Sequence, residues 1–139
     1  MSVDENSKRP QLGVGVIICR NGKVLFGKRL AKHGNNTWSP PGGSLEFGET
    51  IFECAQREAM EETGLRLKNM RAGPFTEDFH SNEGVHLVTF QVIAEADGEP
   101  KAMEPDKFAK WEWVDWNNLP QPLFLPTANL KKQNFNPFE

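Results

Sequence analysis

The sequence lacks long apolar runs, tyrosine and any excess of positive charge. No stretch approaches the roughly 18 consecutive apolar residues of a membrane-spanning helix, so we expect no membrane contact. Lys and Arg number 16 against 19 Asp and Glu, a net charge of −3. That balance excludes a protein whose main partner is a long nucleic acid, because such proteins carry a basic surface. An anionic small molecule would need cations to mediate its binding.

Cysteine is also scarce, since Cys19 and Cys54 are the only two. They fit a reduced cytoplasmic protein better than a disulfide framework, and both are predicted to be small buried residues. Residues 1–10 are polar, without the apolar core of a signal peptide, and are predicted to be a flexible N-terminus. The remainder, 11–139, has the length of a single domain.

A helix is predicted from Ile51 to Thr63. Thr50 and Glu53 have the spacing of a capping box, in which each side chain accepts a hydrogen bond from the other's backbone N–H. Gly64 supplies the left-handed residue that ends a helix.

Three acids of this helix, Glu58, Glu61 and Glu62, share an arc of about 100°. Like charges at such spacings cost roughly a few tenths of a kcal/mol per pair. Either a divalent cation bound by carboxylate oxygens compensates, or the acids form an ordinary solvated face. The adjacent apolar stripe, predicted to pack on a sheet, consists of Phe52, Ala55 and Ala59.

The segment before the helix favours the cation. Residues 40–43 read Pro-Pro-Gly-Gly, a stiff turn followed by two residues without side-chain bulk. Gly48 allows a second bend before the helix. A glycine-rich loop that leads into a carboxylate-bearing helix is suited to holding metal-bound phosphates.

Residues 43–65, GSLEFGETIFECAQREAMEETGL, resemble the signature of the Nudix hydrolases. The positions that match, without a gap in spacing, are Gly43, Glu49, Arg57, Glu58, Glu61, Glu62, Gly64 and Leu65. Ala59 is smaller than the branched residue usual at its position. The resemblance implies an α/β protein with the Nudix fold, a mixed β-sheet sandwiched between α-helices.

The resemblance also implies roles for residues. It implies metal binding, by Mg²⁺ that Mn²⁺ can replace, at Glu58, Glu61, Glu62, Glu104 and the Gly42 carbonyl. It makes Glu58 or Glu61 the expected general base. Glu49 and Arg57 are expected to pair and brace the loop against the helix.

The same resemblance implies hydrolysis of a nucleoside diphosphate linked to another group. The segments PPGGSLEFGE and MEPDKFAKWEWVDW, with PLFLP and NPF near the end, are similar to a subgroup of small diphosphatases. These release pyrophosphate from nucleoside triphosphates or dihydroneopterin triphosphate. The absence of tyrosine argues against diadenosine-polyphosphate hydrolysis. ADP-ribose hydrolysis and a non-catalytic nucleotide sensor remain alternatives, and the resemblance allows a homodimer.

Substrate contacts are expected from several segments. Lys28 and Arg29 end a strand near the glycine loop, where they are either solvated charges or phosphate contacts, Arg being better suited to bidentate binding. The other expected contacts are Gly43, Ser44, Phe124 and Leu125. Ser44 and Leu125 depart from the subgroup, which often has histidine and tryptophan there, so base preference does not follow.

The other segments are predicted by pattern. Strands are expected over 12–19 and 23–29, joined by Asn-Gly in a hairpin, and over 65–75, 85–96 and 111–116. The first is expected to be buried on both faces and the second to be half-exposed. A break is expected at Gly73-Pro74, loops over 76–84 and 97–110, and a helix over 123–133.

His33 has no partner at metal-ligand spacing and is predicted to lie in a solvated loop. Glu83, His80 and His86 are candidates to line a pocket, although such residues are more often simply exposed.

Overall fold

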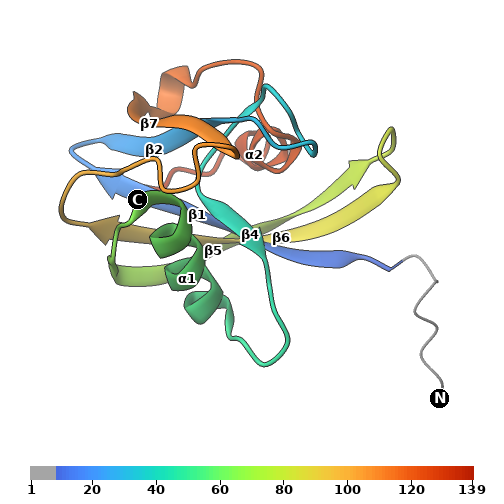
Figure 1. The fold of residues 1–139 in the computed structure, drawn as a ribbon, viewed down its shortest axis with the longest axis horizontal. Coiled ribbons are helices and arrows are strands. Elements are labelled where there is room, and N and C mark those ends of the chain that lie inside the picture. Colours follow the sequence, from blue (N-terminus) through green and yellow to red (C-terminus); the bar gives the residue numbers. More distant parts are fainter. Residues whose placement is uncertain (1–8) are drawn as a thin grey trace.

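The structure is a computed structural model, and it describes residues 9–139, so most of the N-terminal segment predicted as flexible lies outside the described residues. Figure 1 shows a sheet with one helix on each side. The strands are β1 Gln11–Arg20, β2 Lys23–Arg29, β3 Trp38–Ser39, β4 Gly42–Ser44, β5 Leu67–His80, β6 Val85–Ala96 and β7 Phe108–Asp115. The helices are α1 Ile51–Thr63, a 3-10 turn Trp116–Asn118 and α2 Leu125–Lys131. Among the helices of residues 9–139, none combines the length and the apolar composition that a membrane-spanning helix requires.

The sheet is mixed and is centred on β1. Strands follow one another in the order β3-β2-β1-β6-β5, while β4 pairs with β1 and β7 with β2. The β1–β6 pair is parallel, with Val14 opposite Phe90, and the other pairs are antiparallel. β1 and β2 pair only beside their hairpin, through Cys19 with Val24 and Arg20 with Lys23. The sheet therefore opens between these two strands toward the other end of β1.

β1 is apolar on both faces because a hydrophobic core lies on each side of it. Val16 and Ile18 pack in a core with Ala59 of α1. Ile17 packs in a second core with Leu130 of α2. Since successive strand residues point to opposite faces, α1 and α2 cover opposite faces of the sheet. The predicted mixed sheet between helices is confirmed.

Helix α1 begins and ends at the predicted residues. Thr50 Oγ1 accepts from the Glu53 N–H (3.1 Å), and the Glu53 carboxylate accepts from the Thr50 N–H (2.9 Å). Gly64 has φ +75° and donates its N–H to the Met60 carbonyl. The predicted apolar stripe is partly wrong, because Phe52 is 38 % exposed while Cys54 is buried with the two alanines.

Several predicted boundaries are corrected. β5 is continuous through Gly73-Pro74, where the pairing with β6 shifts register instead of ending, and it includes residues 76–80, for which the sequence pattern predicts a loop. The glycine-rich segment contains the short strand β4. β2 is mostly buried, β7 begins at Phe108, and α2 is shorter than predicted at both ends.

Candidate functional site

Arg57 on α1 joins the helix to the segment before it. Its Nε and Nη2 donate to the two carboxylate oxygens of Glu49 at 2.6 and 3.0 Å, a bidentate pair. Its Nη1 donates to Glu58 at 2.7 Å, and its Nη2 donates to the Ser44 carbonyl at 3.1 Å. The hydrogen bonds from Arg57 lower the pKa of Glu49 to about 2. Arg57 thus fixes the positions of β4, the following loop and the side chain of Glu58.

Glu62 points from α1 to the edge of β4. Its side chain is nearly buried, with the residue 6 % exposed, and Oε1 accepts the backbone N–H of Gly42 at 2.8 Å. Burial, reinforced by the charges of Glu58 and Glu104, raises the pKa of Glu62 to about 8, although the Gly42 hydrogen bond opposes the shift. A carboxylate held in this way is stabilised by any cation that approaches it.

The other acids lie around the same strand. Glu58 faces Gly43 so closely that a Cβ there would lie 2.4 Å from its carboxylate. Glu61 is half-exposed and is 3.4 Å from Arg57. Glu104 lies within electrostatic range of both Glu58 and Glu62, since its charge helps to raise the pKa of each. These acids do not form a closed ligand set: in residues 9–139, only His33, His80 and Glu83 bring three ligand atoms within 4.8 Å of one another.

A cavity of about 680 Å³ opens beside the glycines of β4. Its size suits a nucleotide, since small-molecule sites measure roughly 300–1,000 Å³. Most of the predicted substrate contacts line it, namely Arg29, Gly43, Ser44 and Phe124, and so does Gly42. Leu125 is not in the lining and begins α2 instead. The acids of α1 and the cavity therefore meet at β4.

Arg29 is held against an aromatic wall of this cavity. Its guanidinium carbon lies 4.0 Å from the ring centroid of Phe124. Its Nε donates to the His33 carbonyl at 3.1 Å. Burial lowers the pKa of Arg29, although the charges of Glu62 and Glu83 oppose the shift. Arg29 therefore forms part of the cavity wall and is not an ordinary solvated charge.

Polar residues that the sequence pattern does not single out also line the cavity. Thr89, Gln91 and Thr127 are each at most 5 % exposed. Gln91 Oε1 has no hydrogen-bond partner in residues 9–139, so it is an available acceptor. Thr89 donates to the fully buried Asp78 (2.7 Å), which also accepts from Thr76 and Asn129.

The sequence does carry a signal for this part of the cavity. In the run GVGV of β1, Gly13 and Gly15 alternate with valines and so share one strand face. Gly15 packs so closely on Gln91 that a Cβ would lie 2.5 Å from its Oε1. Two glycines on one face of a buried strand leave room beside that face, which a neighbouring side chain or a ligand can occupy.

His33 lies in a loop, as predicted, but the prediction that it is alone there is wrong. His33 and Glu83 line the mouth of the cavity, and His33 Nδ1 contacts a carboxylate oxygen of Glu83. The ring centroid of His80 lies 4.3 Å from that of His33. His86 does not join them and stacks on Phe79 with ring centroids 4.2 Å apart.

Comparison with known proteins gives consistent results. The family profile described as the NUDIX domain matches residues 9–135. The chain is 35 % identical over 118 residues to a protein of Methanocaldococcus jannaschii named ADP-ribose pyrophosphatase, covering 83 % of this chain and 68 % of that protein. It is 39 % identical over 70 residues to the RNA pyrophosphohydrolase of Erwinia tasmaniensis, covering 50 % of this chain and 37 % of that protein.

A solved structure is similar over nearly the whole chain. It is the MutT NUDIX hydrolase from Burkholderia pseudomallei, with a TM-score of 0.85 and 30 % identity, covering 91 % of this chain and 98 % of that one. The NUDIX domain of Shewanella oneidensis NrtR, solved with ADP ribose, has a TM-score of 0.76 at 18 % identity, covers 95 % of this chain and 91 % of that one, and shows the shared fold.

Proposed function

The chain belongs to the Nudix hydrolase family as a pyrophosphohydrolase, and on this basis we propose that it hydrolyses a nucleoside or pterin triphosphate to the monophosphate and pyrophosphate. The observation that carries the proposal is the position of β4. The Gly42 N–H is bonded to Glu62, while Gly42 and Gly43 line a nucleotide-sized cavity. A phosphate chain that extends from a base in this cavity would cross the two glycines and reach the acids.

Nudix hydrolases generally use a divalent metal, and the acids around β4 fit one. Glu62 is buried and negatively charged neighbours surround it, so a cation there would relieve both burial and repulsion. We propose that Mg²⁺, which Mn²⁺ can replace, is held by Glu58, Glu61, Glu62, Glu104 and the Gly42 carbonyl. When bound, the metal supplies charge neutralisation at the phosphates and lowers the pKa of water.

The chain's own residues then position the reaction. The reaction is attack of water on phosphorus, with the proton taken up by a carboxylate, for which we propose Glu58 or Glu61. Arg57 holds Glu58 by a hydrogen bond of 2.7 Å and is itself fixed by Glu49. The missing side chain of Gly43 leaves the space that the Glu58 carboxylate occupies. Catalysis of this kind depends on positioning and electrostatics, not on a covalent intermediate.

Substrate contacts are proposed for the residues that line the cavity. Arg29, Gly43, Ser44 and Phe124 all do so, and the Arg29–Phe124 pair offers a charge and a ring for stacking. For Leu125, the only support for a substrate contact is its position next to Phe124 in the sequence. Gln91 adds an unpaired acceptor that a base amino group could satisfy.

ADP-ribose is a second candidate substrate. It is favoured by the relative from Methanocaldococcus jannaschii that is named an ADP-ribose pyrophosphatase. Stacking on Phe124 would suit the adenine of ADP-ribose as well as the base of a triphosphate. The two candidates differ in their products, because a triphosphate releases pyrophosphate whereas ADP-ribose releases AMP and a sugar phosphate.

The deciding experiment is a substrate panel with and without Mg²⁺, in which pyrophosphate and orthophosphate are measured separately. The panel contains dGTP, dCTP, dihydroneopterin triphosphate, ADP-ribose and a diadenosine polyphosphate. Metal-dependent pyrophosphate release from one triphosphate would support the proposal. Orthophosphate as the first product would contradict it. No turnover together with tight binding of one compound would favour a nucleotide sensor.

We predict that Phe124→Ala raises KM about 10-fold with kcat changed only a few fold, because base stacking on an aromatic ring is worth about 1–3 kcal/mol. The ring lines the cavity, where it lies against the guanidinium of Arg29. Steady-state kinetics on the best substrate of the panel measure both constants. Phe79→Ala is the matched control, because Phe79 is 62 % exposed and lies outside the cavity lining. Equal KM values for the two variants would remove Phe124 from the binding site.

A cytoplasmic location is also proposed, on the state of the two cysteines. Cys19 and Cys54 are both free. Burial raises their pKa values to about 11 and about 12, so both are protonated, unreactive thiols at neutral pH. Such cysteines suit a reducing compartment. The homodimer stays a prediction.

A further inference from the structure

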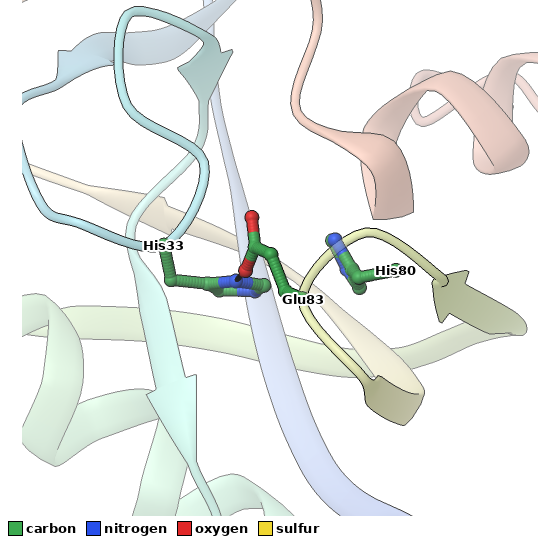
Figure 2. A group of neighbouring side chains, drawn as sticks. All are labelled: His33, His80 and Glu83. Atoms are coloured by element: carbon green, nitrogen blue, oxygen red, sulfur yellow. Dashed lines mark hydrogen bonds and ion pairs between the residues drawn. The ribbon is translucent and has the colours of Figure 1, made fainter.

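The mouth of the cavity carries a second group of candidate metal ligands, separate from the acids of α1. His33 comes from the loop between β2 and β3, whereas His80 is the last residue of β5 and Glu83 lies in the turn between β5 and β6. Figure 2 shows the three side chains converging from these two loops. Each offers one ligand atom, and these atoms all lie within 4.8 Å of one another. The group is formed by tertiary structure, from positions far apart in the sequence.

The imidazoles of this group have unused nitrogens. Nε2 of His33 and Nε2 of His80 are both buried and have no hydrogen-bond partner within residues 9–139. A buried polar atom without a partner is unfavourable, and a bound ion would satisfy both nitrogens and remove that cost. The two unpartnered nitrogens belong to neighbouring rings, whose planes are tilted by 59°.

The surroundings of the group favour ligand binding over solvation. The centroid of the Phe124 ring lies 5.3 Å from that of the His33 ring and 5.7 Å from that of the His80 ring. The Phe124 ring therefore covers one side of the two imidazoles. Glu83 provides the negative charge and contacts His33 Nδ1. His33 and Glu83 also line the cavity, so a position left open on the ion would face it.

The ligand types select the metal. Mg²⁺ and Ca²⁺ prefer oxygen ligands, whereas imidazole nitrogen is suited to Zn²⁺ and similar transition metals. Tetrahedral zinc, with bonds of about 2.0–2.1 Å, places neighbouring ligand atoms about 3.4 Å apart. The side chains of His33 and Glu83 are half-exposed, so they have room to rotate from within 4.8 Å toward that spacing. Two histidines and one carboxylate leave a fourth position for water or substrate.

We propose that His33, His80 and Glu83 bind a transition-metal ion of the Zn²⁺ type at the mouth of the cavity. The ion is distinct from the Mg²⁺ proposed at the acids of α1, and its binding does not depend on the hydrolytic function. By linking the β2–β3 loop to the β5–β6 hairpin, it holds together the two loops at the cavity entrance.

The test is isothermal titration of the metal-free chain with ZnCl₂ in a large excess of Mg²⁺, which occupies sites made of oxygen ligands. We expect one Zn²⁺ per chain, and at least about a 10-fold loss of affinity in His33→Asn and in His80→Asn, since each removes a ligand. His86→Asn is the matched control, because it changes a histidine of the same hairpin that lies outside the group. It should bind Zn²⁺ as the unchanged protein does.

Two further variants keep the result decisive. Glu62→Gln should retain the zinc site, and loss of binding in that variant would place the ion at α1 and overturn the proposal. Unchanged affinity in His33→Asn and His80→Asn would overturn it as well. Should either histidine variant fail to fold by circular dichroism, Glu83→Gln, at a half-exposed loop position, gives the same comparison. Co²⁺ provides a spectroscopic check, because the intensity of its visible absorption bands reports tetrahedral coordination and should be weakened in the same variants.

Discussion

Glu62→Gln is expected to lower turnover at least about 100-fold, because it removes a proposed metal ligand. Loss of a residue that only orients a metal ligand typically costs about 10–100-fold, which is a smaller effect. The amide keeps the oxygen that accepts the Gly42 N–H, so the contact between α1 and β4 persists. The substitution removes the charge that we propose holds Mg²⁺. Steady-state kinetics with the best substrate of the panel, over a range of Mg²⁺ concentrations, measure the loss.

Thermal unfolding separates loss of the metal from loss of the fold. A ligand that binds only the folded state stabilises it, so Mg²⁺ should raise the Tm of the unchanged protein but not that of Glu62→Gln. Glu53→Gln is the matched control, because it makes the same change on the same helix and glutamine also completes a capping box. If the turnover of Glu62→Gln stays within a few fold of that of the unchanged protein, Glu62 is not a ligand of the proposed metal site.

Gly42→Ala is expected to be more destabilising than any other addition of a methyl group in β4. It should lower the free energy of unfolding by roughly 3 kcal/mol or more. A Cβ there would lie 2.2 Å from the Val14 carbonyl oxygen and 3.1 Å from the Gly15 Cα. Both atoms are backbone of the central strand β1, so neither can rotate away. Urea unfolding midpoints, followed by tryptophan fluorescence, measure the change.

Two neighbouring glycines provide controls for this prediction. Gly13 lies on β1, and the atom nearest to an added Cβ there, Thr89 Oγ1, is 3.6 Å away. Gly13→Ala should therefore change the free energy of unfolding by less than about 1 kcal/mol. At Gly43 the three atoms nearest to an added Cβ all belong to the Glu58 carboxylate, which is side chain and not backbone. Gly43→Ala should therefore reduce activity more than stability. Equal midpoints for the Gly42 and Gly13 variants would contradict the close approach of β4 to β1.

The sequence predicts the parts of the fold that local interactions determine. Helix α1 is predicted residue by residue, because its capping box and its terminal Gly64 act within a few residues of the helix ends. β6 is predicted equally well, since Val85–Ala96 is rich in β-branched and aromatic residues and contains no glycine or proline. The acids of α1 and the glycines of β4 are likewise close in sequence, so their proximity can be anticipated.

The errors arise where distant partners decide the structure. The local pattern over residues 76–80 indicates a loop because Thr76 and Asp78 are polar, yet both are buried in β5, where Thr89 and Asn129 supply hydrogen bonds to Asp78. Neither partner is visible from the local sequence. His33 looks solitary in the sequence for the same reason, since the hairpin that brings its neighbours is nearly 50 residues away.

The parallel pairing of β1 with β6 has a consequence for how the molecule acquires its structure during synthesis. Gln11 pairs with Leu87 and Ile18 with Ala94, so β1 has no parallel partner until most of the chain has been made. Helix α1, with local caps, can form as soon as it emerges, whereas contacts so distant in sequence form slowly. Phe124 and Thr127 follow later still, so the lining of the cavity is completed only after the acids of α1 have been made.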